Sequence, residues 1–193
     1  MDYKSIRMIH EEHAALSALL ASMAMLLRRG PRDQPGTFFD SMRAMLFYID
    51  EFPQRLHHPK ESELLFPMVA LRAPSTRELI ERLEQDHVEG EAEVRKLQHL
   101  LLAWELLGDS RRQAFEHSFH PYLNFYLEHM RQEELVIIPA ALKVLRPKDW
   151  DLLDQAFSDN QDPLTGKYPD DPIYDQLFTR IVMKTPAPIG LAD

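Results

Sequence analysis

Apolar residues recur at helical spacing through most of the first 146 positions of this 193-residue chain. At 100° per residue, Ile6, Ile9, Leu16 and Leu20 fall on one stripe of the first segment. No segment shows the alternation that is typical of a half-buried strand. The sequence therefore predicts an all-α fold in which each helix buries one face against the others.

Four long helices are expected, joined by short connections. They cover roughly residues 3–29, 37–71, 75–108 and 109–145. Pro53 and Pro59 must kink or interrupt the second helix, and Ser75 with Glu78 forms a candidate capping box at the start of the third. Because short connections favour antiparallel neighbours, residues 1–146 are predicted to form an antiparallel up-down-up-down four-helix bundle.

The character of the chain changes after Arg146. Residues 147–193 contain two short helical patterns, "PKDWDLLDQAF" and "IYDQLFTRIVMK", separated by a loop and followed by a tail. Their aromatic and aliphatic side chains predict a C-terminal extension that packs on the bundle. The sequence assigns no chemical role to this extension.

Composition excludes several classes of function. The formal net charge of −9 argues against a nucleic-acid surface. The absence of cysteine excludes disulfides, thiol catalysis and thiolate-bound metals. The apolar run at 14–27 is too short to span a bilayer, which takes about 20 residues, and the N-terminus lacks the apolar core of a signal peptide. A cytoplasmic protein without nucleic-acid or membrane partners is expected.

An internal repeat carries the candidate chemistry. The segments "HHPKESELLFP" (57–67) and "HMRQEELVIIP" (129–139) both read H-x3-E-x5-P and lie 72 residues apart. Upstream, "EEHAAL" around His13 parallels "QDHVEG" around His87, 74 residues later. The first two helices therefore look duplicated as the third and fourth.

The repeated polar residues project toward the core of the predicted bundle. These residues are His13, His57, Glu61, His87, His129 and Glu133. Unpaired charge is too costly to bury, and each histidine–glutamate pair at i, i+4 lies on one helix face. Six such donors exceed the needs of one tetrahedral zinc ion and suit two ions of higher coordination number. Imidazole and oxygen donors without sulfur favour iron, and secondarily manganese or zinc.

These residues resemble the hemerythrin-like, histidine–histidine–glutamate cation-binding domain over roughly residues 3–146. The resemblance implies a four-helix bundle with a non-haem di-iron centre. It further implies that His13 and His57 serve one iron, that His87 and His129 serve the other, and that Glu61 and Glu133 bridge them.

Two departures from the oxygen-carrying members argue against simple reversible dioxygen carriage. Those proteins have a second histidine four residues after the first on the third helix, where this chain has Glu91. Their last carboxylate is an aspartate five residues after its histidine, whereas Glu133 follows His129 by four.

Four further residues are candidates for an additional ligand or for a hydrogen-bond partner of a ligand. Glu91 shares the stripe of His87 and equally fits a solvated face. His58 and His10 are each interpreted as an extra ligand or as a residue at the rim of the site. Tyr126 either hydrogen-bonds to a bound group or fills the core with its ring.

Two classes of function remain open. The first is a protein that binds or senses dioxygen, a related small diatomic ligand, or iron itself. The second is a di-iron enzyme that consumes peroxide or nitric oxide, or that repairs iron centres. The lack of cysteine weakens the repair version, and the oligomeric state is left open.

Overall fold

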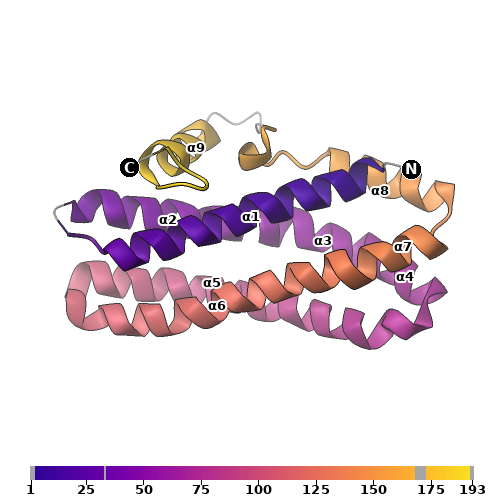
Figure 1. The fold of residues 1–193 in the computed structure, drawn as a ribbon, viewed down its shortest axis with the longest axis horizontal. Coiled ribbons are helices and arrows are strands. Elements are labelled where there is room, and N and C mark those ends of the chain that lie inside the picture. Colours follow the sequence, from indigo (N-terminus) through magenta and orange to yellow (C-terminus); the bar gives the residue numbers. More distant parts are fainter. Residues whose placement is uncertain (1–2, 33, 168–172, 192–193) are drawn as a thin grey trace.

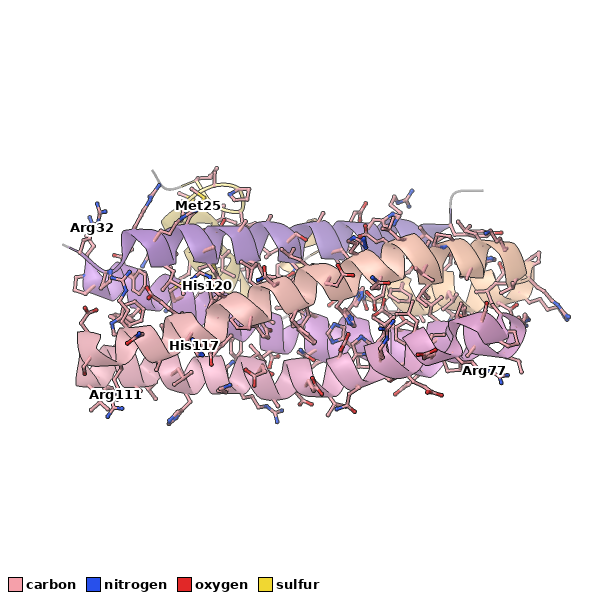
Figure 2. The ribbon with its side chains drawn as sticks, turned by 60° about the horizontal axis from the view of Figure 1, so that its bottom comes forward. Met25, Arg32, Arg77, Arg111, His117 and His120 are labelled. Carbon is pink, nitrogen blue, oxygen red and sulfur yellow. The ribbon has the colours of Figure 1, made fainter. Side chains whose placement is uncertain are left out.

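Long helices lie lengthwise beside one another and form a bundle (Figure 1). The computed structural model describes residues 3–32, 34–167 and 173–191, and the all-α class predicted from the sequence is confirmed in this part of the chain. Arg77 and Arg111 mark opposite ends of the bundle (Figure 2). None of the helices in the described ranges combines the length and apolar character needed to cross a membrane.

The helices follow one another with short connections. Their bounds are α1 Lys4–Arg29, α2 Pro35–Glu51, α3 His58–Lys60, α4 Phe66–Arg72, α5 Arg77–Leu107, α6 Arg112–Gln132, α7 Ile138–Val144, α8 Pro147–Ser158 and α9 Ile173–Lys184. Three π-helical turns connect some of them without a break in the helical path. These are Pro53–His57 between α2 and α3, Glu61–Leu65 between α3 and α4, and Glu133–Ile137 between α6 and α7.

Proline explains each π turn. Pro59, Pro67 and Pro139 lack an N–H, and in a regular helix their rings would clash with the carbonyl four residues back. In each case the preceding residue donates its N–H to the carbonyl five residues back, for example Phe66 to Glu61 and Ile138 to Glu133. The helix widens by one residue at these points. The predicted second helix is therefore interrupted yet continues to Arg72.

The start of α5 differs from the predicted capping box. A 3-10 turn, Pro74–Thr76, precedes the helix, and no side chain caps its first turn. The Thr76 hydroxyl donates to the Ala73 carbonyl at 2.8 Å instead. Pro74 fixes the backbone of this tight turn, so the α-helix begins beyond Ser75 and the predicted role of Ser75 as the cap is wrong.

The buried side chains form two apolar clusters. One contains Leu20, Met42, Trp104 and Phe119, and the other contains Ile9, Phe66, Leu83, Ile137 and Trp150. Along every long helical path, the histidines and glutamates of the repeat lie between residues of one cluster and residues of the other. The bundle therefore has a polar layer between two apolar ends.

The C-terminal residues run back along α1 and α2 (Figure 1). Trp150 of α8 stacks on Tyr3 with ring centroids 4.1 Å apart. Asp154 of α8 accepts hydrogen bonds from the backbone N–H and the hydroxyl of Ser5, at 2.8 and 2.6 Å. This carboxylate thereby satisfies a free N–H in the first turn of α1. The Tyr174 hydroxyl of α9 donates to Glu51 at 3.1 Å.

Candidate metal centre

The polar layer brings the six predicted donors together. His13 lies on α1, His57 ends a π turn, His87 lies on α5, His129 lies near the end of α6, and Glu61 and Glu133 each begin a π turn. All six side chains are buried. Helix periodicity turns these side chains inward, and the π turns place each glutamate where the helix is widest.

The histidines form two pairs. The Nε2 atoms of His13 and His57 lie 3.3 Å apart, and those of His87 and His129 lie 3.2 Å apart. The pairs come from opposite halves of the sequence repeat. Each pair therefore presents two ring nitrogens toward the middle of the layer.

Each glutamate spans both histidine pairs. The Oε1 atom of Glu61 lies 3.2 Å from His57 Nε2, and its Oε2 atom lies 3.5 Å from His87 Nε2. The Oε2 atom of Glu133 lies 3.3 Å from His13 Nε2, and its Oε1 atom lies 3.0 Å from His129 Nε2. Two carboxylates thus bridge two imidazole pairs.

The donor set fits metal cations. All four oxygens of Glu61 and Glu133 are buried without a hydrogen-bond donor, and an uncompensated buried carboxylate is costly. Metal bonds of about 2.1 Å put neighbouring ligand atoms roughly 3.0–3.4 Å apart in octahedral or tetrahedral sites. Most of the distances between the donor atoms match this spacing. Cations would satisfy both the oxygens and the facing nitrogen lone pairs.

A ring of outer hydrogen bonds fixes the four imidazoles. Each Nδ1 atom faces a side chain of a neighbouring helical path: His57 faces Glu12 at 2.6 Å, His87 faces Ser62 at 3.0 Å, His129 faces Asp86 at 3.2 Å, and His13 faces Glu134 at 3.0 Å. A carboxylate can only accept, so Nδ1 carries the proton wherever it faces one. The inward Nε2 atom then keeps its lone pair for a cation.

Electrostatics inside the layer favour positive charge. Burial alone would lower the pKa of His57, but Glu61 and Glu12 raise it well above the usual value. For His129, burial is likewise outweighed by Glu133 and Asp86, which raise the pKa to about 10. Without a metal, His57 and His129 are therefore protonated, because the two buried carboxylates stabilise positive charge beside them.

His58 adds a nitrogen donor beside the second pair. Its ring stacks on His87 with centroids 4.0 Å apart, and a ring nitrogen lies within 4.8 Å of donor atoms of His87 and His129. Burial and the neighbouring imidazoles hold the pKa of His58 well below its usual value. Its Nδ1 atom faces Gln54 Oε1 at 3.1 Å, so neutral His58 donates there and keeps the lone pair of Nε2.

Tyr126 supports this arrangement. Gln54 accepts from His58 through Oε1 and donates from Nε2 to the Tyr126 hydroxyl, so one amide joins His58 to the tyrosine. Gly90 of α5 provides the space, since a Cβ atom there would lie 2.7 Å from that hydroxyl. Tyr126 therefore acts on the layer through Gln54.

The structure does not bring Glu91 or His10 into the layer. The Glu91 carboxylate pairs with Arg95 one turn away on the outside of α5, and His10 is exposed. Neither residue belongs to a group of converging donors in the described ranges. His117 and His120 lie on α6 far from the layer (Figure 2).

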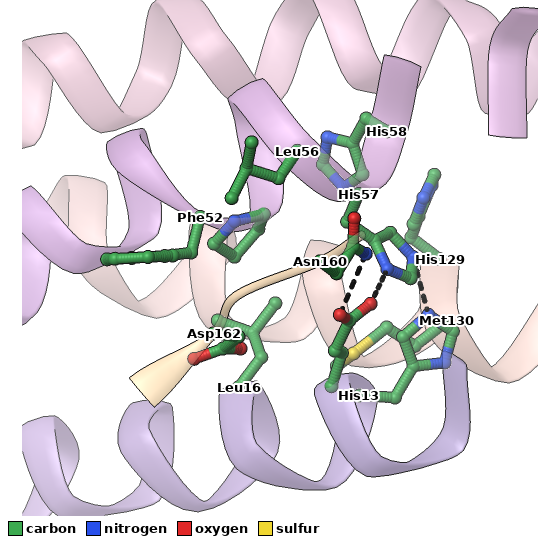
Figure 3. A pocket seen from close by; sticks show the side chains of 12 residues that line it. His13, Leu16, Phe52, Leu56, His57, His58, His129, Met130, Asn160 and Asp162 are labelled. Atoms are coloured by element: carbon green, nitrogen blue, oxygen red, sulfur yellow. Dashed lines mark hydrogen bonds and ion pairs between the residues drawn. The ribbon is translucent and has the colours of Figure 1, made fainter. Parts of the chain in front are cut away.

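A small cavity of about 20 Å³ adjoins the histidines (Figure 3). Leu16, Phe52, Leu56 and Met130 contribute apolar walls, and His13, His57, His58 and His129 contribute their rings. Asn160 and Asp162, from the segment after α8, also line it, and so do Glu12 and Pro53. The space suits one molecule of about the size of water or dioxygen.

The comparisons with known proteins agree with this geometry. The family described as the hemerythrin HHE cation-binding domain matches residues 4–141. The chain belongs to this family. The buried histidine–glutamate cluster of this hemerythrin domain is able to hold metal. A comparison with curated proteins found no match.

Sequence reasoning missed the outer ring of the hemerythrin layer. Its members sit beside the repeated donors: Glu12 and Asp86 precede the first histidine of each half, and Ser62 and Glu134 follow each glutamate. Adjacent helix positions differ by 100°, so each neighbour faces the next helical path. The acid before His13 and the acid before His87 were the available signal. No pattern in the sequence pointed to Asn160.

Proposed function

We propose that this protein is a non-haem di-iron protein built on an up-down-up-down four-helix bundle. The observation that carries the proposal is the arrangement of the two buried carboxylates. Each carboxylate faces a histidine of the first pair and a histidine of the second pair. His13 with His57 would hold one ion, and His87 with His129 would hold the other. Manganese and zinc are the alternative metals. Iron, when bound, supplies reversible coordination of small ligands and electron transfer.

We propose that His58 serves as a fifth nitrogen donor on the side of His87 and His129. Its neutral state and its contact with Gln54 support this role. The two metal positions then differ, with three imidazoles on one side and two on the other. The side with fewer protein donors is the one formed by His13 and His57, both of which line the cavity.

The cavity favours binding or sensing of a small ligand over conversion of a larger substrate. Its volume of about 20 Å³ suits one small molecule, and the side chains of Leu16, Phe52 and Leu56 give part of its wall an apolar surface. An apolar pocket admits dioxygen or nitric oxide without a desolvation cost. We therefore assign the protein to binding or sensing of dioxygen, a related ligand, or iron itself.

One observation favours a second function, the reduction of peroxide. Asp162 lines the cavity, and burial raises the pKa of its carboxyl group to about 6. Such a group exchanges protons near neutral pH. Reduction of hydrogen peroxide to two waters consumes two protons and two electrons. Two ferrous ions held by the layer would supply the electrons, an external reductant would restore them, and a protonatable group in the cavity would supply a proton.

Metal analysis tests the proposal. We expect about two irons per chain in the wild type, and less iron in His57→Ala and in His129→Ala. His117→Ala, which removes an exposed histidine, is the matched control and should keep full loading. Unchanged iron content in both site variants would refute the assignment.

The visible spectrum of the loaded protein separates the two functions. Reversible changes on cycling between reducing conditions and dioxygen support binding. Rapid and repeated loss of added peroxide supports an enzyme.

A further inference from the structure

Asn160 connects the C-terminal extension to the ring of hydrogen bonds around the histidines. It lies in the segment after α8, outside the part of the chain that matches the hemerythrin family, and only 1% of its surface is exposed. Its Nδ2 atom donates to Glu12 Oε1 at 2.8 Å, while Glu12 Oε2 lies 2.6 Å from His57 Nδ1. The Glu12 carboxylate thus connects Asn160 of the extension to His57 through two hydrogen bonds (Figure 3).

Lys60 fixes the orientation of the Asn160 amide. The Lys60 ammonium donates to Asn160 Oδ1. An ammonium is only a donor, so the oxygen end of the amide must face Lys60 and the NH₂ end must face Glu12. Both ends of this buried amide are satisfied, which makes Asn160 a rigid connection.

Among the residues that the structure describes, the other half of the repeat has no such connection. Asp86 is the counterpart of Glu12 and faces His129 in the same way, but its side chain is 29% exposed, against 8% for Glu12. Asp86 borders a surface groove lined by α5 and α6 alone, with no residue of the extension. The described part of the extension therefore buries and fixes one of two equivalent carboxylates and leaves the other beside the groove.

We propose that Asn160 is a positioning residue that makes the two metal positions inequivalent by holding Glu12 against His57. This inference rests on the proposed function and adds a role for the extension. A fixed acceptor at Nδ1 keeps the His57 ring oriented and makes its Nε2 atom a stronger ligand. Without the Asn160 donor, Glu12 Oε1 becomes a buried oxygen free to turn toward Lys60, and His57 loses its fixed acceptor.

Titration with Co²⁺ tests this role in the full-length, metal-free protein. The wild type is expected to bind two ions in steps that competition with a chelator resolves. Asn160→Ala should weaken the affinity of one binding step about 10-fold and leave the other within about 2-fold. A 10-fold loss is the lower end of what is expected when a residue that orients a metal ligand is removed. The visible absorption of Co²⁺ at the weakened step should also shift, which a general loss of stability would not cause.

Two further variants keep the test decisive. Asn160→Asp retains the volume of the side chain but removes the donor to Glu12, so it should weaken the same step even if the alanine variant folds poorly. Thr165→Val is the control, because the Thr165 hydroxyl donates to a backbone carbonyl of the same segment, that of Asp162, at 2.9 Å. It should leave both steps and the absorption unchanged.

The outcomes separate this inference from the proposed function. Two wild-type steps, with one weakened only in the Asn160 variants, support the role of Asn160. Two wild-type steps that both Asn160 variants leave unchanged overturn the inference and keep the metal centre. Equal weakening of both steps by Asn160→Ala and Thr165→Val also overturns it, because the segment would then act through stability alone. A wild type that binds no Co²⁺ and no Fe²⁺ rejects the proposed function itself.

Discussion

Each histidine of the polar layer divides its two ring nitrogens between two tasks. Nδ1 faces a hydrogen-bond partner on a neighbouring helical path, and Nε2 faces the buried carboxylates. The partners are adjacent in sequence to donors of the same layer. A single substitution beside a donor therefore alters the hydrogen bond that holds a histidine of another helix.

Asp162 gives a pH-dependent prediction at the residue scale. Burial raises the pKa of its carboxyl group from 3.8 to about 6 in the folded protein, despite the Tyr48 hydroxyl that donates to it at 2.6 Å. A raised folded-state pKa contributes stability that is fully present below about pH 4 and lost as the pH rises through about 6. Relative to Asp162→Asn, the wild type should therefore gain up to about 3 kcal/mol of unfolding free energy between pH 8 and pH 4.

Urea unfolding of the metal-free proteins at several pH values measures this difference. Protonation of histidines far from Asp162 affects both proteins alike and cancels in the comparison, whereas the charge of His57, which lowers the pKa of Asp162, contributes to the difference. A difference that stays constant across the range would contradict the assigned pKa.

The π turns decide the geometry at the scale of elements. Glu61 and Glu133 each begin a π turn, and each turn ends before an X-Pro bond. Regular α-helical bonding would change the rotation between the residues before the turn and the residues after it. The prolines at the end of each repeated motif therefore help to orient the glutamate side chains through the backbone of the π turn.

Pro139→Ala tests this role. Alanine supplies an N–H and removes the ring, so the α-helical register becomes accessible and Glu133 should turn from its place between the histidine pairs. We expect metal affinity to fall about 10-fold, as for other residues that orient ligands. Pro121 is also a proline within a helix, in α6, but it is exposed. Pro121→Ala should raise helix stability and leave metal affinity unchanged, and equal effects of the two substitutions would refute the argument.

Periodicity and repetition predicted the helical class and the convergence of His13, His57, His87 and His129. These features depend on side-chain direction within single helices, which sequence spacing determines. The contact of Asn160 with Glu12 was not predictable, because it joins residues 148 positions apart through an irregular segment. The 3-10 turn before α5 was missed for a local reason, since Pro74 displaced the expected cap at Ser75.

At the scale of the whole molecule, the polar layer separates two apolar clusters. The layer contains two buried carboxylates that, without metal, are balanced only by the imidazoles that face them, among them His57 at 3.2 Å from Glu61 and His129 at 3.0 Å from Glu133. Such groups weaken the metal-free bundle, while the clusters on either side hold its helices in place. The stability of the protein should therefore depend strongly on metal.

Thermal unfolding with and without metal tests this dependence. Each ion present at 100 times its Kd adds about 2.7 kcal/mol, so two ions add about 5 kcal/mol. For a domain of this size, the Tm should rise by about 10–20 °C on addition of Fe²⁺ or Co²⁺. Mg²⁺, which prefers oxygen ligands alone, should have little effect. An unchanged Tm with every transition metal would contradict the proposed centre.

Because both repeat halves lie in one polypeptide, their equivalent positions can carry different residues. In an assembly of two identical helix pairs, every mutation would appear twice and the two positions would remain copies. Here Ser62 occupies the place that Glu134 has in the other half, so His87 faces a hydroxyl and His13 faces a carboxylate. Because the halves are covalently linked, a substitution in one half leaves the equivalent position of the other half unchanged.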